Sequence, residues 1–167
     1  MQRTIIIKRH LSYPVEKVWK TIADGQILGK WFMPNDFEPI VGWEFTFRKP
    51  PQKGWDGITW CQVIDCQSLK TVAFTYRGEA TGEKTLACAG VKSDTADKAA
   101  KGIFTQLDTV LRFSVKSSAE GTLLTLEHSG FKGLKLVIVS LVMGMGWKKI
   151  MDTRLLEVLG QMSQDKK

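Results

Sequence analysis

Residues 132–162 read KGLKLVIVSLVMGMGWKKIMDTRLLEVLGQM, and their apolar side chains recur at steps of three or four residues. This spacing places the apolar side chains on one side of a helix. They are Leu136, Val139, Met143, Trp147, Ile150 or Met151, Leu155, Val158 or Leu159, and Met162. A helix of this length would be roughly 40 Å long. We expect it to lie across the concave face of a sheet, with the functional site between the two.

Two features of this helix are unusual. Its first half, from Leu134 to Met145, is apolar nearly all round, whereas the second half is amphipathic. The apolar run is interrupted by Lys135 and is shorter than the ~20 residues that a bilayer requires, so we expect no transmembrane segment. Gly144 and Gly146 each destabilise a helix interior by about 1 kcal/mol relative to alanine. They therefore predict a kink, or a helix that begins late.

The preceding chain predicts a sheet and two short helices. A β-branched run over 4–11 predicts a first strand, and Ser12 is a plausible cap for the helix that follows. A second short helix ends near Trp31, because Pro34 forbids its continuation. The apolar period then changes to two, and it is clearest at 43–47. Further strands are predicted at 57–64, 69–77, 107–116 and 122–129. Short strands joined by tight turns predict an antiparallel sheet, and hence an α+β fold.

The segment 78–102, GEATGEKTLACAGVKSDTADKAAKG, differs from its surroundings. It is small, polar and rich in alanine, with few side chains that could anchor a core. We interpret it as a long loop inserted between two strands of a single domain that spans 1–167. Long loops in compact domains are either functional lids or mobile excursions, and we expect the second.

The composition is that of a globular protein, with 43% hydrophobic and 25% charged residues in a chain of 167. The apolar run at the N-terminus is only three residues long, which is too short for a signal peptide. Three cysteines, Cys61, Cys66 and Cys88, suggest reduced thiols, and Cys61 and Cys66 should lie on opposite faces of a strand. We therefore expect a cytoplasmic protein.

The net charge of +7 does not by itself indicate a nucleic-acid partner, because lysine and arginine are scattered and form no basic run. The basic excess is greatest around the last helix. There Lys132, Lys135, Lys148, Lys149 and Arg154 are opposed only by Asp152. The plain interpretation is a solvated helix face. The alternative is attraction to an acidic lipid surface or an acidic partner.

Several short segments, taken in the order in which they occur along the chain, resemble those of a known superfamily. They are PVEKVW (14–19), WF (31–32), DFE (36–38), VGWEF (41–45), Gly57 with VID (63–65), GTLLTLEHSGF (121–131) and GW (146–147). Each motif is weak alone, but the ordered set spans nearly the whole chain. The sequence resembles the START-like, helix-grip superfamily (SRPBCC). Within it, the sequence is most similar to the proteins named after the activator of heat-shock-protein-90 ATPase.

The resemblance implies a curved antiparallel sheet wrapped around the long C-terminal helix, with two short helices closing one end. Such folds commonly hold a cavity for an apolar or amphipathic small molecule. The family has no shared catalytic motif, so the resemblance assigns no catalytic residue. The segment 78–102 departs from the short turn that the family usually has there, which affects the expected cavity mouth.

Side chains at alternate strand positions, together with the apolar stripe of the helix, are the candidates for lining a cavity. They are Phe45, Phe47, Phe74, Tyr76, Leu111, Phe113, Leu124 and Leu126 on the strands, Met143, Trp147 and Met151 on the helix, and Trp31, Trp60 and His128 in addition. The plain alternative for any one of them is that it fills a solid core. Buried tryptophans would need hydrogen-bond partners for their indole N–H groups.

Evidence for catalysis in the sequence is slight. His10 is expected to be solvated, and a lone His128 is more often structural than catalytic. Asp36 and Glu38 do not form an acid–base pair by spacing alone. The sequence has no nucleophile elbow, no paired-cysteine motif and no phosphate loop, and no convergent set of metal ligands. We expect no cofactor and no metal.

Three functions therefore remain. The first is non-catalytic binding of a hydrophobic or amphipathic small molecule by a monomer or homodimer. The second is a chaperone cofactor or protein-interaction module, in which Val137, Ile138 and Leu141 would form an exposed patch. The third is a cyclase- or hydrolase-like enzyme, which would require His128, Tyr76 and Arg112 to converge in the cavity.

Overall fold

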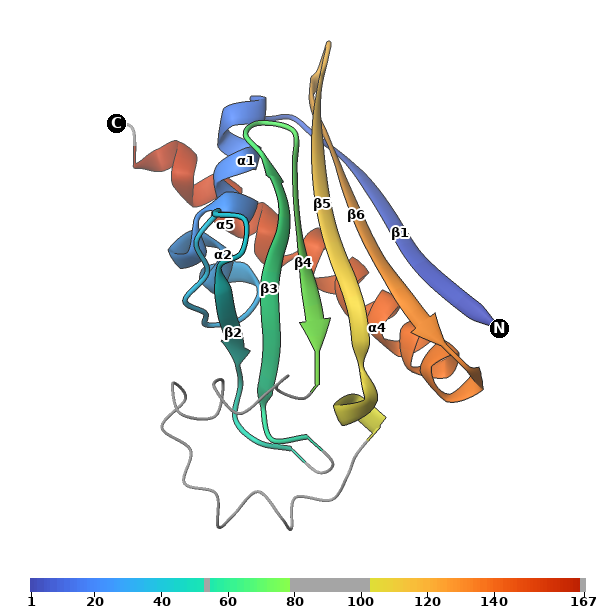
Figure 1. The fold of residues 1–167 in the computed structure, drawn as a ribbon. Coiled ribbons are helices and arrows are strands. Elements are labelled where there is room, and N and C mark those ends of the chain that lie inside the picture. The colour runs from blue at the N-terminus through green and yellow to red at the C-terminus, as the bar shows by residue number, and fades with distance from the viewer. Residues whose placement is uncertain (53–54, 79–102, 166–167) are drawn as a thin grey trace.

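The computed structural model describes residues 1–52, 55–78 and 103–165. Apart from Gly78, the predicted loop 78–102 lies outside the described residues. Six strands form one sheet whose order is β1-β6-β5-β4-β3-β2, with every neighbouring pair antiparallel (Figure 1). The strands are β1 (Gln2–Leu11), β2 (Glu44–Arg48), β3 (Ile58–Gln67), β4 (Thr71–Arg77), β5 (Asp108–Ser118) and β6 (Gly121–Lys132).

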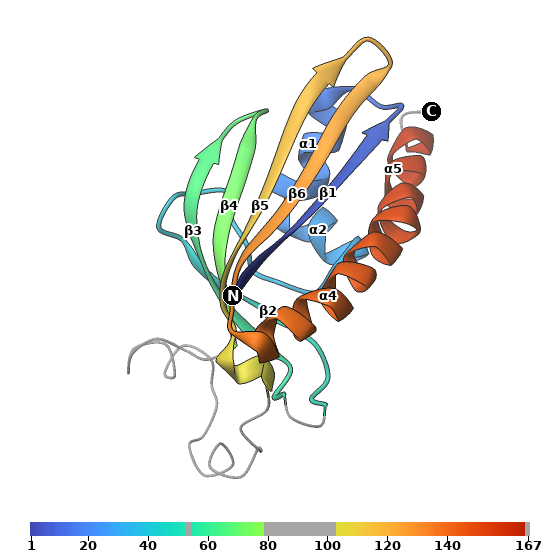
Figure 2. The ribbon, with the colours of Figure 1, turned by 90° about the vertical axis from the view of Figure 1, so that its right-hand side faces the viewer.

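The sheet curves around the helices, so the molecule has one layer of sheet and one of helices (Figure 2). The helices are α1 (Val15–Ala23), α2 (Gly25–Trp31), the short 3-10 helix η1 (Ile103–Gln106), α4 (Leu134–Asp152) and α5 (Arg154–Gln164). This arrangement confirms the predicted fold class. The concave face of the sheet, α1, α2 and the α4–α5 pair enclose one hydrophobic core.

Alternation along each strand sets the two faces of the sheet, because successive side chains of a strand point to opposite sides. In β1, Ile5 and Ile7 are buried whereas Ile6 is 58% exposed. In β6, residues 122, 124, 126 and 128 are buried in the same way. The period of two in the sequence therefore identifies the inward face of these strands correctly.

The helix α1 is not capped as predicted, whereas α2 has a side-chain cap. α1 begins after Pro14, whose carbonyl accepts hydrogen bonds from the N–H groups of Lys17 and Val18. No side chain caps this helix, so Ser12 is not its cap. The side chain of Asp24 caps α2 by accepting from the N–H groups of Gln26 and Ile27. The Asp24-Gly25 dipeptide therefore ends α1 and starts α2.

The long C-terminal helix is divided at Thr153, not at the glycines, so the predicted kink was in the wrong place. Thr153 has φ −121° and ψ −80°, outside the helical region, and its hydroxyl donates to the carbonyl of Lys149 at 2.7 Å. Gly144 lies inside α4, where an added Cβ would be 3.8 Å from the side chain of Ile5. This is an ordinary van der Waals distance, and an added Cβ at Gly146 would meet no atom within 4 Å, so neither position requires glycine for reasons of space.

One ion pair ties the end of α4 to the sheet. The guanidinium of Arg9 in β1 donates to Asp152 at 2.6 and 3.0 Å. This contact lowers the pKa of Asp152 through its hydrogen bond to Arg9. The α4–α5 junction is therefore held against the edge strand.

Gly42 and Gly57 have similar positive φ angles but different surroundings, so substituting each of them provides a stability test. Gly57 has φ +85°, and an added Cβ would lie 2.1 Å from the carbonyl oxygen of Lys49. Gly42 has φ +89° with no atom within 4 Å of an added Cβ. We expect Gly42→Ala to destabilise by about 1 kcal/mol through the left-handed backbone alone. Gly57→Ala should cost about 2 kcal/mol or more, because Lys49 must also move.

Urea unfolding of the two variants measures this difference directly. Equal losses of stability at both positions would contradict the close approach of Gly57 to Lys49.

Among the described residues, no helix combines the length and the apolar character needed to cross a bilayer.

Candidate functional site

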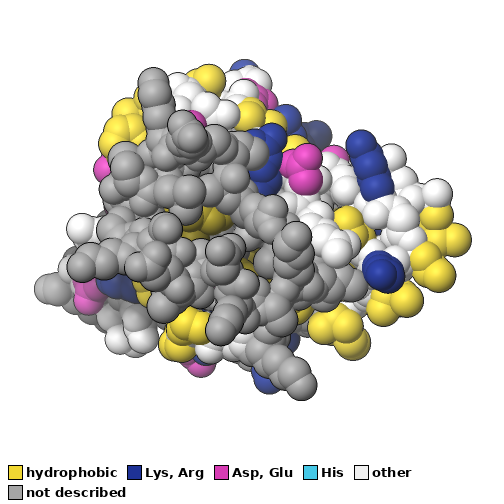
Figure 3. All heavy atoms as spheres, turned by 60° about the horizontal axis from the view of Figure 1, so that its bottom comes forward, with side chains coloured by type: hydrophobic (Ala, Val, Ile, Leu, Met, Phe, Trp, Pro, Cys, Tyr) yellow, Lys and Arg dark blue, Asp and Glu magenta, His cyan; other side chains and the backbone are white. Residues whose placement is uncertain are grey.

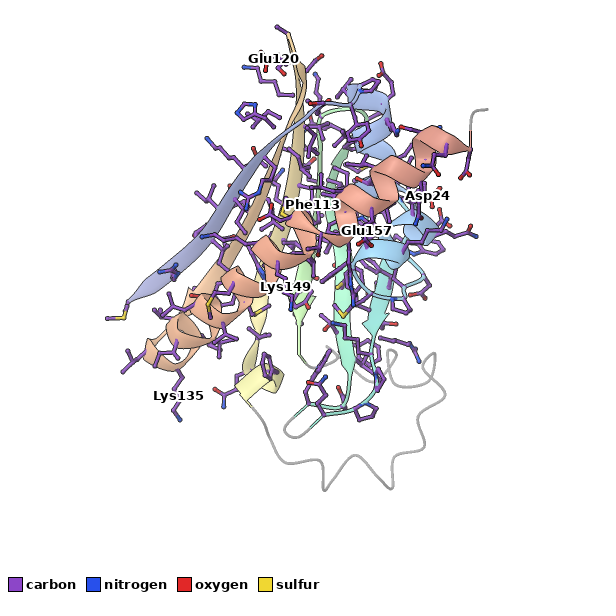
Figure 4. All side chains as sticks on the ribbon, turned by 180° about the vertical axis from the view of Figure 1, so that it is seen from behind. Asp24, Phe113, Glu120, Lys135, Lys149 and Glu157 are labelled. Atoms are coloured by element: carbon purple, nitrogen blue, oxygen red, sulfur yellow. The ribbon has the colours of Figure 1, made fainter. Side chains whose placement is uncertain are left out.

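The space between the sheet and α4 is filled mainly by aromatic side chains. Phe32, after α2, lies between Phe47 and Trp147, with ring centroids 4.8 and 4.5 Å away. Phe113, at the middle of β5, meets Trp147 edge-on at 6.1 Å. Figure 4 shows Phe113 behind the α4–α5 helix pair, at the centre of the sheet. The centre of the predicted cavity is therefore packed with rings.

Most of the predicted cavity residues lie in this packed core. Those that are nearly or fully buried there are Trp31, Phe45, Phe47, Phe74, Leu111, Phe113, Leu124, Leu126, Trp147 and Met151. The indole N–H of Trp31 donates to the carbonyl of Thr21 at 2.8 Å, which supplies the partner that a buried tryptophan requires.

Trp60 lies on the other face of the sheet. In β3 it alternates with the buried Thr59 and Cys61, and it is only half-buried. Its cross-strand partner in β2 is Thr46, whereas Phe45 and Phe47 pair with Cys61 and Thr59. Because directly paired residues share a face, Trp60 points away from α4. Tryptophan content alone suggested it, and the strand register removes it from the inner face.

A cavity of about 180 Å³ opens at one end of the core, next to the packed rings. Tyr76 and Met143 are the two predicted residues that line it. The remaining lining residues are Phe32, Met33, Lys49, Gln52, Trp55, Thr59, Gly78, Phe104 and Leu107. Most of these come from the end of α2, the β2–β3 connection and the segment before β5, whereas Thr59 lies in β3 and Gly78 follows β4. Sequence reasoning missed most of them because connecting segments carry no periodic pattern.

The polar groups of this cavity are few and well defined. Burial raises the pKa of the Tyr76 phenol, and a hydrogen bond with Thr59 opposes part of that rise. The phenol is therefore neutral at physiological pH and can donate or accept a hydrogen bond. Lys49 and Gln52 are exposed lining residues, whereas Thr59 is buried. The cavity therefore combines apolar walls with the neutral hydroxyl groups of Thr59 and Tyr76 and the cationic side chain of Lys49.

His128 sits beside the cavity residue Tyr76 but is held in a closed hydrogen-bond chain. The indole N–H of Trp147 donates to His128 Nδ1 at 3.3 Å, which leaves the ring proton on Nε2. Nε2–H then donates to the Thr109 hydroxyl at 2.8 Å. That hydroxyl donates to the carbonyl of Tyr76, also at 2.8 Å. The chain links α4 to strands β6, β5 and β4.

The environment of His128 keeps its ring neutral. The rings of Tyr76 and Phe131 lie at 5.1 and 4.7 Å, and the side chain is fully buried. Desolvation lowers the pKa of His128 to about 3. Both ring nitrogens are occupied by structural partners. This arrangement suits a core histidine that joins helix to sheet.

The groups required for the enzyme hypothesis are not all brought together. Arg112 points from β5 to the outer face, where it donates to Asp65 at 2.7 Å. His128 and Tyr76 are on the inner face. Asp36 accepts from the backbone N–H of Thr46 at 2.9 Å, a structural contact. Within the described residues, no three His, Cys, Asp or Glu side chains are grouped as metal ligands.

The described cysteines are free thiols. Cys61 is buried on the inner face and Cys66 is partly exposed. Burial raises the pKa of both thiols. They are not joined to each other, but the prediction that they lie on opposite faces was wrong. The register shift between Val63 and Asp65 pairs Cys66 with the inward-facing Val72, so both cysteines lie on the inner face of the sheet. Cys88 lies outside the described residues.

A curved antiparallel sheet holding a long C-terminal helix, with two short helices after the first strand, defines the helix-grip class. The sequence also matches the family model "Activator of Hsp90 ATPase homolog 1-like protein" over residues 12–160. The chain therefore belongs to this family. No curated protein matches the sequence.

Solved structures share the fold over nearly the whole chain. MLL2253 from Mesorhizobium loti is 26% identical with a TM-score of 0.69, and the match covers 99% of each chain. BH1534 from Bacillus halodurans is 24% identical with a TM-score of 0.68, over 95% of this chain and 99% of that one. CalU16 from Micromonospora echinospora is 18% identical with a TM-score of 0.59, over 98% and 85%.

Proposed function

We propose that this protein binds a small amphipathic molecule in the cavity between β3, β4, α4 and the β2–β3 connection. The single observation that carries the proposal is the cavity itself, which has mostly apolar walls beside a few polar groups. Ligand sites are typically apolar with a small number of placed polar groups that fix orientation. The family fold supports a ligand-binding role of this kind.

The size of the cavity indicates the size of the ligand. An engineered apolar cavity of about 150 Å³ is sufficient to bind benzene. A volume of about 180 Å³ therefore suits a molecule with one ring, or an acyl fragment of similar bulk. Larger molecules would have to extend through the mouth.

The polar groups indicate the chemistry of the ligand. Phe32, Phe104 and Met143 offer rings and a flexible thioether to its apolar part. The Thr59 and Tyr76 hydroxyls would hydrogen-bond to a carbonyl or hydroxyl group. Lys49, which is exposed, would attract an anionic group near the mouth. An aromatic carboxylate combines these properties, and we take benzoate, which has a single ring, as a probe.

A matched pair of methionines tests this proposal. Met143 lines the cavity, whereas Met145 lies two residues further along α4 and is 65% exposed. We expect benzoate to shift the methyl NMR signal of Met143 and leave that of Met145 unchanged. Met143→Trp should fill the cavity and weaken binding at least tenfold, whereas Met145→Trp should have no effect.

Native mass spectrometry and organic extraction of the purified protein complete the experiment. A bound aromatic or lipid-like compound would support the proposal and identify its chemistry. Protein that is empty, together with a Met143 signal that no probe moves, would contradict it. Equal effects of the two tryptophan variants would place the binding site elsewhere.

A further inference from the structure

The outer face of α4 carries an exposed apolar stripe. Its members are Leu134, Ile138, Leu141, Val142 and Met145, each between 48% and 65% exposed. Their spacing of four, three, one and three residues keeps them on one side of the helix. The buried residues Val139, Ser140, Trp147 and Met151 occupy the opposite side. We call the exposed set the α4 stripe.

A helix that is apolar all round is normally buried. α4 has apolar residues on both sides, but only one side faces the core. Figure 2 shows α4 at the border of the molecule, with its first turns extending away from α1, α2 and α5. Figure 3 shows hydrophobic side chains gathered at the right of the view, with Lys or Arg side chains among them. The α4 stripe is therefore accessible to a large partner.

The charged residues that flank the α4 stripe in the sequence have one sign. Lys132, Lys135, Lys148 and Lys149 flank it and are exposed. No aspartate or glutamate occurs between residues 128 and 151. The first acid after them, Asp152, is engaged by Arg9 at 2.6 Å. In Figure 4, Lys135 and Lys149 project from the two ends of this helix.

From this combination we infer that α4 docks on the surface of an anionic lipid bilayer, with the α4 stripe in the interfacial region. Apolar residues on one face, with lysines beside them, are the signature of helices that lie in a membrane interface. Each basic residue near such a surface contributes about a fivefold gain in binding. A second copy of the chain fits less well, since a two-fold pairing would bring the lysines of both copies together.

This inference is independent of the proposed ligand. Met143, on the inner side of the same helix, lines the cavity, so a docked bilayer would lie one helix away from it. Membrane docking requires only the outer side of α4. Failure of one proposal would leave the other standing, and the experiment below contains no small-molecule probe.

Flotation of the full chain with lipid vesicles provides the test. We expect binding to vesicles of 70% phosphatidylcholine and 30% phosphatidylglycerol at low salt, and little binding to pure phosphatidylcholine. The double variant Ile138→Gln/Leu141→Gln should bind at least tenfold more weakly. The double variant Lys148→Gln/Lys149→Gln should lose a similar factor. Leu156→Gln, at a 41% exposed position on α5, is the matched control and should bind normally.

Several outcomes would overturn the inference. Wild-type protein that does not float with anionic vesicles would exclude docking. Vesicle binding that the Ile138→Gln/Leu141→Gln variant retains would assign docking to another surface. If sedimentation shows a wild-type dimer that this variant no longer forms, the α4 stripe is instead the contact with a second copy. Since both positions are exposed, circular dichroism should show that the variant keeps its fold.

Discussion

Trp147→Ala should lower the free energy of unfolding by about 3–5 kcal/mol, the range for removing a large buried aromatic side chain. Trp147 is 3% exposed, and it lies against Phe32 and Phe113. Alanine would leave a cavity between helix and sheet. It would also leave His128 Nδ1 without the indole donor that now satisfies it. Both losses act in the same direction, so we expect one of the largest single-residue effects in the protein.

Urea unfolding at pH 7.5 measures this effect. Trp60→Ala is the matched control, because it makes the same chemical change on the outer face of the sheet. Only roughly 1 kcal/mol should be lost there, as for other half-exposed side chains that pack on their cross-strand neighbours, here Thr46 and Arg77. A Trp147 variant that is as stable as the Trp60 variant would contradict the packing of α4 on the sheet.

The second large effect is a loss of stability in mild acid that depends on His128. An unfolded histidine binds a proton with a pKa near 6.5, but burial lowers the folded pKa of His128 to about 3. Between these values the unfolded state binds more protons than the folded state. Stability therefore falls as the pH is lowered through this window. The expected loss is about 2 kcal/mol between pH 6.5 and pH 5, and it continues to grow toward pH 3.

His128→Gln separates this contribution from those of other groups. Glutamine can accept from Trp147 and donate to Thr109, but it does not titrate. Its unfolding free energy should change much less between pH 6.5 and pH 5 than that of the wild type. The lowered pKa values of Asp65 and Asp152 place their losses below pH 4, outside this window. A wild-type slope in the His128 variant would contradict the assignment.

Trp147 shows how much of the structure can be predicted from the sequence. The spacing of Trp147 on the helix predicts that it faces the core, and it does. The need for an indole partner follows from burial alone. The identity of that partner cannot be predicted from burial, because His128 is 19 residues away and reaches Trp147 only when α4 crosses the sheet. The role of His128 as a structural link thus required the three-dimensional arrangement.

The candidate site was less predictable than the fold. Alternation along β2 and β4 identified side chains of the inner face, but most of these fill the core. The cavity itself is formed by ends and connections such as Met33, Gln52 and Trp55. Such residues have no period to identify them, since their neighbours in space are far away in the sequence. Tyr76 and Met143 were predicted only because each also belongs to a periodic element.

The order of strands and helices, the inward faces of β2, β4 and β6 and the apolar residues on all sides of α4 are properties of local periodicity, and the amino-acid sequence specifies them. The break at Thr153, the outward direction of Trp60 and the position of the cavity were decided by tertiary packing. The physical reason is the same for all three. Register and docking depend on which surfaces meet after the sheet has curved around α4, and a pattern within one segment contains no information about its distant neighbours.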